Sequence, residues 1–588
     1  MLFGKSVNRY YFKYWYFFLM GAAALIVVDI AQLEIPNITG LIIDGISEKN
    51  LTQEFLVKSI IQLVGIIAIM FFGRFFWRMN IFNCGHRIAH DLRTRMFKKM
   101  EYLDQTYFNE YKTGAQMALY TNDLMTVRQC FSQAFMMLID ALFLGVLAFS
   151  KMFMLNKVLA FVAAAPLLLL AVIGILVSKY MRSKWEARQK AYSDLSDFAQ
   201  ENFSGFSVVK AFVKETKELM AFNRLNKNNQ DKNLEHARLS VLVSIFVSLL
   251  ISSIMIIIGA VGAYLVYLTK TTGVHYMSLG DLNRYISYFS SLVWPMMALS
   301  NLITISAQGK ASLERIDTVL KRDSLVKDSP DVIKNAELKG KIEFKNLTFA
   351  YPGVEDPTLK NISFSVEQGE SIGIIGRTGS GKSTIVDLLV RLYNVPEGSI
   401  FIDGYDIMKL PIKDVRELIS FVPQDNFLFS DTVLNNIAFS KEELTLEQTR
   451  KYAKIAGVDA DVMDFPKQYD TVMGERGVTL SGGQKQRVSI SRALAKDSGV
   501  LILDDSVSAV DTKTEATILG NLKKLHGEKT FIIIAHRVST IQNLDKIVLI
   551  DEGQVVSIGT HDELYENVKM YRDIVDLQKL EEQVHEVK

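Results

Sequence analysis

Gly376-Arg377-Thr378-Gly379-Ser380-Gly381-Lys382-Ser383 is the stretch that decides the fold of the second half of the chain. An apolar run, 372–375, leads into it, and a helix-like run that starts at Thr384 leads out of it. The GxxxxGKS spacing leaves little side-chain bulk, so successive backbone N–H groups can surround a polyphosphate. Lys382 adds a positive charge toward the β- and γ-phosphates, and the Ser383 hydroxyl can hold Mg²⁺.

The helix that follows this loop adds its positive N-terminal end to the same place. The segment therefore predicts an α/β phosphate-loop domain that binds ATP and Mg²⁺, with contacts from residues 376–384. The alternative is a glycine-rich turn that only links a strand to a helix.

Length and composition limit the classes of protein to be considered. A chain of 588 residues is too long for one hydrophobic core, so two or more domains are expected. The net charge of +2 gives no basis for a nucleic-acid partner, because such partners need a concentrated basic face. The two cysteines, Cys84 and Cys130, support no disulfide framework.

The first half of the chain is unusually apolar, and its composition changes near residue 325. A helix needs roughly 20 apolar residues to cross a bilayer. Six stretches meet this requirement: about 16–46, 56–77, 130–151, 157–179, 240–268 and 277–305. We therefore expect an N-terminal all-α membrane domain of six long helices over 1–325, a linker over 326–340 and an ATPase domain over 341–588.

Basic residues orient these six stretches. Clusters of Lys and Arg lie in 5–13, 78–99 and 179–190, whereas the alternate loops hold few. The positive-inside rule then places both termini, the two long loops and the ATPase domain in the cytoplasm, with the helices in the cell membrane. The two long loops show heptad-like apolar spacing, which predicts helices that continue beyond the lipid.

Several residues of the second half are candidates for contact with a nucleotide. Tyr351 lies ahead of the phosphate loop and could stack on a purine, although alone it would be a core residue. Gln424 follows a strand-like run and could reach Mg²⁺ or the water at the γ-phosphate; alone it would be a surface residue. Ser481-Gly482-Gly483-Gln484 opens a helix and forms a second anion site with nothing local to bind.

The candidate catalytic residues follow two apolar strands. Asp504 ends the run 500–504 and can hold Mg²⁺ through water. Asp505 stands where a general base for hydrolysis belongs. His536 follows the run 531–534 and is placed to sense a γ-phosphate, although a histidine there could also be structural.

The order of these segments closely resembles the ATPase domain of ABC transporters. LSGGQ at 480–484, then a strand ending in Asp, then a SALD-like loop at 508–511, is highly specific to that family. The membrane half resembles type IV (B-type) ABC exporters: 107–128 looks like their first intracellular loop, 201–212 like the second, and 307–316 like the connection to the ATPase.

The resemblance implies a half-transporter that works as a dimer. In the family, ATP is held between the phosphate loop of one chain and the LSGGQ segment of the other, which explains the second anion site at 481–484. ATP binding draws the two ATPase domains together, hydrolysis releases them, and the intracellular loops pass this motion to the membrane.

Asp505 departs from the family pattern, in which hydrolysing members usually carry Glu. Aspartate is one methylene shorter, and a misplaced general base costs on the order of 10²–10⁴ in rate. One interpretation is a tolerated change in a homodimer. The favoured one is the subunit of a heterodimeric multidrug exporter whose own site is weak, paired with a chain that has Glu there and an altered LSGGQ segment.

The membrane half also suggests the substrate. Charges inside membrane spans are costly and usually functional, and the candidates are Asp29, Glu34, Asp44 and Asp140. A cavity with carboxylates favours hydrophobic or cationic amphipathic molecules, so we expect multidrug export across the bilayer. The alternatives are a lipid or peptide exporter, and an ATP-gated regulator that does not pump.

Overall fold

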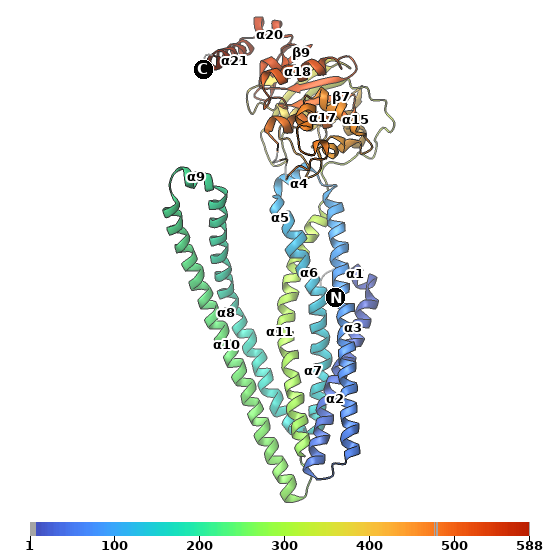
Figure 1. The fold of residues 1–588 in the computed structure, drawn as a ribbon, viewed down its shortest axis with the longest axis vertical. Coiled ribbons are helices and arrows are strands. Elements are labelled where there is room, and N and C mark those ends of the chain that lie inside the picture. Colours follow the sequence, from blue (N-terminus) through green and yellow to red (C-terminus); the bar gives the residue numbers. More distant parts are fainter. Residues whose placement is uncertain (1–7, 475–476, 478–479, 587–588) are drawn as a thin grey trace. The chain divides into compact units, whose positions relative to one another are not determined.

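The computed structural model describes residues 8–474, 477 and 480–586, and it divides the chain into two compact units. The first unit comprises Met1–Met100 and Gly114–Lys321, and the second comprises Glu101–Thr113 and Arg322–Lys588. The first is entirely helical and the second is α/β, as the sequence predicts (Figure 1). Each unit is described separately below.

The helical unit is built from long helices joined by short turns. Its elements are α1 (Asn8–Lys13), α2 (Trp15–Ser47), α3 (Gln53–Met100), α5 (Thr113–Ala118), η2 (Leu119–Asp123), α6 (Leu124–Gln129), η3 (Cys130–Ala134), α7 (Phe135–Leu155), α8 (Lys157–Ser204), α9 (Phe206–Ala211), α10 (Glu215–Thr272) and α11 (Leu279–Lys321). In Figure 1, α8 and α10 run side by side and α9 joins them. The long loops are thus helical, as their heptad-like spacing predicts.

Five helices of the described residues are long and apolar enough to cross a membrane, where the sequence predicts six. They are α2, α3, the continuous helix Thr113–Leu155, α10 and α11. The remaining predicted span, 157–179, lies in α8, but the side chains of 164–176, 178 and 179 lie outside the described residues. The number of six is therefore not confirmed.

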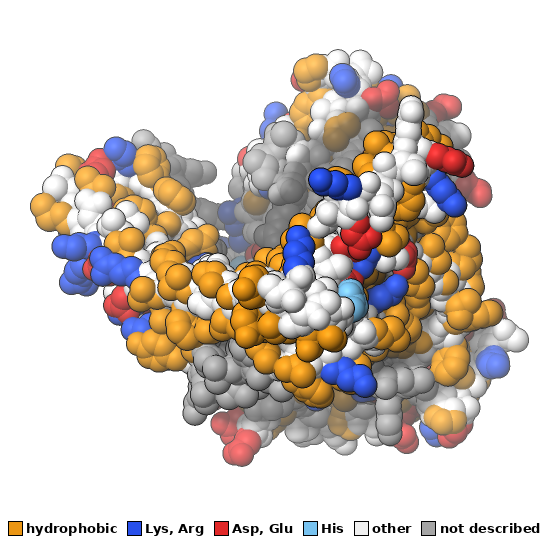
Figure 2. Space-filling model, turned by 90° about the horizontal axis from the view of Figure 1, so that it is seen from below, with side chains coloured by type: hydrophobic (Ala, Val, Ile, Leu, Met, Phe, Trp, Pro, Cys, Tyr) orange, Lys and Arg blue, Asp and Glu red, His pale blue; other side chains and the backbone are white. Residues whose placement is uncertain are grey.

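The surface of the helical unit is apolar where lipid is expected. On α3, Ile61, Val64, Phe71 and Phe72 are each at least 60% exposed. Figure 2 shows hydrophobic side chains spread over much of this unit, with charged ones scattered among them. A patch this large on a monomer indicates contact with a membrane or a partner.

Inside the unit, α2, α7 and α11 share a core. Leu33, Leu144 and Met152 are buried against Tyr285 and Phe289 of α11. The three helices come from distant parts of the sequence, so this core holds the first and last predicted spans together.

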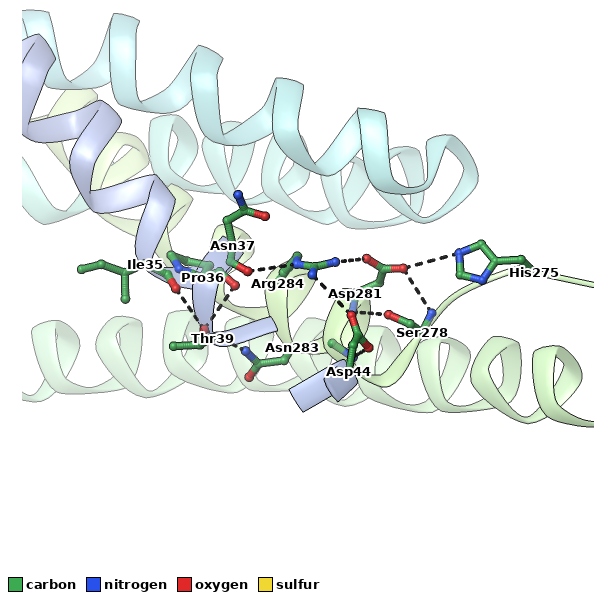
Figure 3. A network of polar contacts seen from close by, with 11 residues as sticks. Ile35, Pro36, Asn37, Thr39, Asp44, His275, Ser278, Asp281, Asn283 and Arg284 are labelled. Carbon is green, nitrogen blue, oxygen red and sulfur yellow. Dashed lines mark hydrogen bonds and ion pairs between the residues drawn. The ribbon is translucent and has the colours of Figure 1, made fainter. Parts of the chain in front are cut away.

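A polar network joins one end of α2 to the start of α11 (Figure 3). Arg284 is buried and pairs with Asp281 on its own helix and with Asp44 on α2, where Nη2 and Oδ2 are 3.3 Å apart. Asp44 Oδ1 also accepts a hydrogen bond from the backbone N–H of Gly280, at 2.7 Å. The helices approach so closely that a Cβ on Gly280 would collide with the carbonyl of Gly40.

The second unit contains two sheets. The six-stranded sheet has the order β10-β9-β3-β8-β7-β6, and the four-stranded sheet has the order β2-β1-β4-β5. The strands are β1 (Ile342–Phe349), β2 (Leu359–Val366), β3 (Ser371–Gly376), β4 (Ile400–Ile402), β5 (Tyr405–Asp406), β6 (Ile419–Val422), β7 (Val500–Asp504), β8 (Thr530–Ile534), β9 (Lys546–Asp551) and β10 (Gln554–Gly559).

The helices of this unit include α4 (Gln105–Glu110), α12 (Lys382–Leu389), α13 (Ile412–Leu418), α14 (Val433–Ile437), α15 (Leu446–Ile455), α16 (Asp459–Met463), α17 (Gly482–Lys496), α18 (Thr512–Lys523), α19 (Val538–Ile541), α20 (His561–Asn567) and α21 (Lys569–Glu586). In the six-stranded sheet, strands β6, β7, β8, β3 and β9 run parallel and β10 is antiparallel. The carboxyl ends of β3, β7 and β8 therefore lie at one edge of the sheet, where ligands bind in open α/β folds.

Candidate nucleotide site

The phosphate loop connects the end of β3 to the start of α12. Gly379 and Gly381 have φ angles of +82° and +93°, which side chains other than glycine rarely adopt. A Cβ on Gly376 would collide with the carbonyl oxygen of Ile550. Arg377 and Thr378 are exposed at the tip. The glycines of the sequence pattern are thus required by the backbone itself.

Lys382 folds back into this loop. Its side chain is 5% exposed, and Nζ donates hydrogen bonds to the carbonyls of Gly376 at 3.0 Å and Arg377 at 2.8 Å. Burial lowers the pKa of Lys382, while the charges of Asp504 and Asp505 act in the opposite direction. The ammonium is therefore held inside the loop, close to two carboxylates.

One buried polar atom in the loop lacks a partner. Ser380 Oγ is inaccessible and makes no hydrogen bond within the part of the chain that the structure describes. An unpaired buried hydroxyl costs about 1–3 kcal/mol. A phosphate oxygen would satisfy it, so the loop fits the polyphosphate that its sequence predicts.

Asp504 lies at the end of β7 and is 4% exposed. Burial raises the pKa of Asp504, a hydrogen bond from Ser383 opposes this, and the charge of Asp505 reinforces it. Asp504 and Ser383 are thus side by side, and both offer the oxygen ligands that Mg²⁺ takes together with phosphates. The residues present fit this ion.

Asp387, on α12, also belongs to this acidic environment. Burial first, and the charge of Asp504 second, raise the pKa of Asp387 to about 6. Sequence reasoning missed Asp387, because no motif marks it and only packing brings it near Asp504.

Asp505 has an unusual backbone. Its φ of +46° lies in the left-handed region, where Asp occurs more often than most residues. Its N–H donates to the carbonyl of Ile534 at 2.9 Å, and its own carbonyl accepts from Ser508 Oγ at 2.9 Å. The position is thus determined by β8 on one side and by the SALD-like loop on the other.

His536 and Gln424 occupy different positions relative to this centre. His536 is half-buried just beyond β8, and its charge acts on Asp504, so the ring lies near the carboxylate. Gln424 is exposed on the turn after β6, and its backbone carbonyl accepts a hydrogen bond from Asn426 Nδ2 at 3.4 Å. The structure brings His536 to the centre but shows no contact between the Gln424 side chain and the described site residues.

Tyr351 lies half-buried at the side of the phosphate loop. Its hydroxyl is 2.9 Å from Thr384 Oγ1, at the start of α12. Its ring packs edge-on against Tyr393, with 5.1 Å between centroids, and against Phe349 at 5.2 Å. The tyrosine is thus fixed to the loop by a hydrogen bond and to the core by two rings.

The LSGGQ segment caps α17. The backbone N–H of Ser481 donates to Gln484 Oε1 at 3.1 Å, and the N–H of Gln484 donates to Ser481 Oγ at 3.2 Å. Ser481 and Gly482 are exposed, and Gly483 approaches the carbonyl of Ala509. No hydrogen bond recorded for the described residues joins 481–484 to the phosphate loop.

Comparison with known proteins decides the family. The family model "ABC transporter transmembrane region" matches residues 18–296, and "ABC transporter" matches residues 359–508. The chain is 33% identical over 579 residues to the probable multidrug resistance ABC transporter ATP-binding/permease protein YheI of Bacillus subtilis, covering 98% of this chain and 97% of that protein. The chain belongs to the ABC transporter family.

Other members are similar over comparable lengths. The multidrug resistance-like ATP-binding protein MdlA of Escherichia coli is 32% identical, with 98% of this chain and 96% of MdlA covered. The ATP-dependent lipid A-core flippase of Pseudoalteromonas translucida is 33% identical over 84% of both chains. A bacterial Atm1-family ABC exporter, solved with ATP bound, has the same fold, with a TM-score of 0.76, 24% identity and coverage of 97% and 98%.

This ABC transporter is therefore a membrane ATPase that couples ATP hydrolysis to export. The helical unit is the membrane domain and the α/β unit carries the ATPase, which confirms the predicted helical membrane domain and α/β ATPase domain, but not the predicted number of six spans.

Proposed function

We propose that this ABC transporter exports hydrophobic or amphipathic compounds as one half of a dimer. The LSGGQ segment, exposed at Ser481 and Gly482, carries the proposal, because among the described residues it shares no hydrogen bond with the chain's own phosphate loop. In the phosphate loop, Lys382 is buried against the loop carbonyls. The N-terminus of α17 at Ser481 is exposed and could bind a phosphate. We infer that this phosphate belongs to a nucleotide held by the phosphate loop of another chain. A second chain, facing the first, would complete both sites.

Each side chain has a role in this scheme. Lys382 turns from the loop carbonyls to the phosphates, and Ser380 and the loop N–H groups bind their oxygens. Ser383 and Asp504 would hold Mg²⁺, which would neutralise charge at the transferring phosphoryl group. Tyr351 would stack on the adenine, His536 would contact the γ-phosphate, and Asp505 would accept the proton of the attacking water. Gln424 would have to move to reach Mg²⁺ or this water, because its exposed side chain makes no recorded contact with the described site residues.

The short carboxylate of Asp505 favours a heterodimer. The LSGGQ segment of this chain is complete and properly capped, so it can serve the site of a partner. The partner would carry Glu at the position of Asp505 and an altered LSGGQ segment. The relatives named as multidrug proteins support export of many compounds, and ATP turnover would then occur mainly at the partner's site.

Two buried carboxylates in the membrane domain suggest cationic substrates. Asp29 on α2 is 3% exposed, and its Oδ2 has no hydrogen-bond partner within the described residues. Asp140 on α7 is also buried and accepts a hydrogen bond from Trp294 Nε1 at 3.0 Å. A buried charge without a partner is unstable, and an amphipathic cation would neutralise it beside an aromatic surface.

Lipid export is the second candidate. The similarity to a lipid A-core flippase over 84% of the chain favours it, because such a substrate is also amphipathic. The two candidates differ in the charge of the substrate: an anionic lipid would not be drawn to Asp29 and Asp140.

Transport in vesicles tests the proposal. The chain is purified from native membranes with any second subunit, which mass spectrometry identifies, and is reconstituted. We expect ATP-dependent accumulation of a cationic dye, abolished by Lys382→Ala and reduced several-fold by Asp29→Asn. ATP binding without accumulation of dye or labelled lipid would overturn export in favour of a regulator. Uptake of labelled lipid alone would favour the lipid exporter.

A further inference from the structure

The backbone on both sides of Arg537 is held by one side chain from the C-terminal helix. Gln578, on α21, donates from Nε2 to the carbonyl oxygen of His536 at 2.7 Å. Its Oε1 accepts from the backbone N–H of Val538 at 2.8 Å. The amide thus satisfies one acceptor and one donor of the segment that carries the catalytic histidine, much as a neighbouring β-strand would.

The helix that supplies Gln578 is firmly docked. Tyr571 and Val575 are buried in the same core cluster as Ile533 and Val538. Gln578 comes three residues after Val575, so it lies on the same face of the helix. The position of Gln578 is therefore set by packing, and its amide is held ready to receive the backbone at His536.

A second contact holds the segment just after the histidine, from another direction. Glu515 on α18 is 3% exposed, accepts a hydrogen bond from Thr540 and lies 3.6 Å from Arg537 Nη1. These bonds act on Arg537 and Thr540. Among the described side chains, Gln578 is the one with a recorded hydrogen bond to the backbone of His536 itself.

The backbone position of His536 matters because the proposed role of its ring requires it to reach the γ-phosphate. A charge on His536 would lower the pKa of Asp504, so the ring lies near the carboxylate that is proposed to hold Mg²⁺. The two hydrogen bonds of Gln578 fix the peptide that follows His536, and so restrict the backbone from which the ring projects.

We propose that Gln578 is a positioning residue for His536, through which the docking of α21 controls ATP hydrolysis at this chain's own site. The inference rests on the proposed role of His536 at the γ-phosphate. Gln578 touches neither nucleotide nor Mg²⁺ in this scheme. It acts by holding the backbone from which the histidine projects, and so affects turnover without affecting nucleotide binding.

Hydrogen exchange of the complete transporter tests the contact. Gln578→Leu keeps the size of the side chain and removes both hydrogen bonds. We expect the Val538 amide to exchange about tenfold faster, because two bonds of this kind are lost. Asp573→Ala, an exposed change on the same helix, should leave it unchanged. Unaltered exchange at Val538 in Gln578→Leu would refute the contact.

Kinetics test its consequence. In the purified complex, Gln578→Leu in the Asp505→Glu background should remove most of the turnover that the glutamate adds, and should leave KM within twofold. In the complex with Asp505 it should change the total rate little, because turnover there occurs mainly at the partner's site. In a His536→Ala background, Gln578→Leu should cause no further loss, because its effect passes through the histidine. Gln578→Glu, which still accepts from Val538 but cannot donate to His536, should also be impaired.

The possible failures are distinguishable. If His536→Ala lowers turnover and Gln578→Leu does not, the positioning role is wrong and the proposed function stands. An equal loss from Gln578→Leu with and without His536 would show a general structural effect and also overturn the inference. If His536→Ala itself has no effect in the Asp505→Glu background, the role of the histidine fails and the inference with it.

Discussion

At the scale of single residues, the most informative position is Asp505, where the family pattern that this chain resembles usually has Glu. Its carboxylate is half-buried beside the buried charge of Asp504, and its backbone is left-handed, with φ of +46°. Asp is tolerated in that conformation better than most residues. The backbone thus suits Asp, whereas the proposed role as general base favours the longer Glu.

Replacement of Asp505 by Glu should raise turnover at this chain's own site about tenfold to a hundredfold, because a better-placed base recovers part of a contribution of about 10²–10⁴. ATP turnover of the purified complex measures this. Asp505→Asn, which removes the base without changing size, should give no increase. An ATPase rate that is the same for Asp505 and Glu would argue against a weakened base.

At the scale of elements, the contact between α2 and α11 depends on two glycines. Gly40 and Gly280 allow the helices to approach until Asp44 meets both the N–H of Gly280 and the guanidinium of Arg284 (Figure 3). Small residues permit such close packing between membrane helices. The ion network therefore exists because both positions lack a side chain.

Gly280→Ala should lower stability by about 1–3 kcal/mol, since the added methyl group meets the Gly40 carbonyl and the Asp44 carboxylate. The Tm of the full transporter in detergent measures the loss. Gly65→Ala is the matched control, because a Cβ there meets nothing within 4 Å. Equal Tm values for the two variants would contradict the close packing.

The same scale includes the attachment of α4. Asp104 accepts hydrogen bonds from the backbone N–H of Leu325 at 2.5 Å and from Ser324 Oγ at 3.1 Å. Burial alone would raise the pKa of Asp104, but these bonds and that from Thr106 outweigh it, so the pKa lies below its ordinary value. The charged carboxylate thus ties α4 to the chain that enters the ATPase.

This depressed pKa makes the attachment sensitive to acid. The carboxylate contributes stability above its unfolded pKa of about 3.9, and the contribution is lost as the pH falls through the folded pKa. Asp104→Asn should increase exchange of the Leu325 amide already at pH 7 and remove the further loss below about pH 4. The rate of hydrogen exchange of the Leu325 amide, corrected for its intrinsic pH dependence, measures both the effect at pH 7 and the effect below about pH 4. Asp331→Asn, an exposed change, is the control.

At the scale of the whole molecule, the chain passes three times between its two units. Residues 101–113 belong to the ATPase unit, although α3 before them and α5 after them are membrane-domain helices. Within the ATPase unit, Asn109 of α4 donates to the hydroxyl of Tyr393 at 3.0 Å, and Tyr393 packs on Tyr351, which contacts Thr384. A contact chain thus links the start of α12, beside the phosphate loop, to α4.

α4 is continuous in sequence with α3 and α5, and the second unit is also joined to α11 at residue 322. These three helices are therefore the covalent connections between the two units. The resemblance of 107–128 to an intracellular loop anticipates a coupling segment. It does not anticipate that Tyr393 links this segment to Tyr351, the residue proposed to stack on the adenine.

The sequence by itself determined the fold class, the long helices and the residues of the phosphate loop, because each depends on local spacing: glycines where φ is positive, apolar runs long enough for a bilayer, and a carboxylate at the end of a buried strand. The structure brings Asp504, Lys382 and Ser383 close together, and their roles toward ATP and Mg²⁺ stay predictions. It also named Gln424, whose side chain is exposed and makes no recorded contact with that site.

Only the tertiary structure decided the contacts between distant segments. Gln578 meets His536 across 42 residues, Asn109 meets Tyr393 across 284, and Arg284 meets Asp44 across 240. Asp387 likewise gains its raised pKa from packing near Asp504. The physical reason is that hydrogen bonds and desolvation act over a few ångströms in space, and a sequence pattern records neighbours along the chain only.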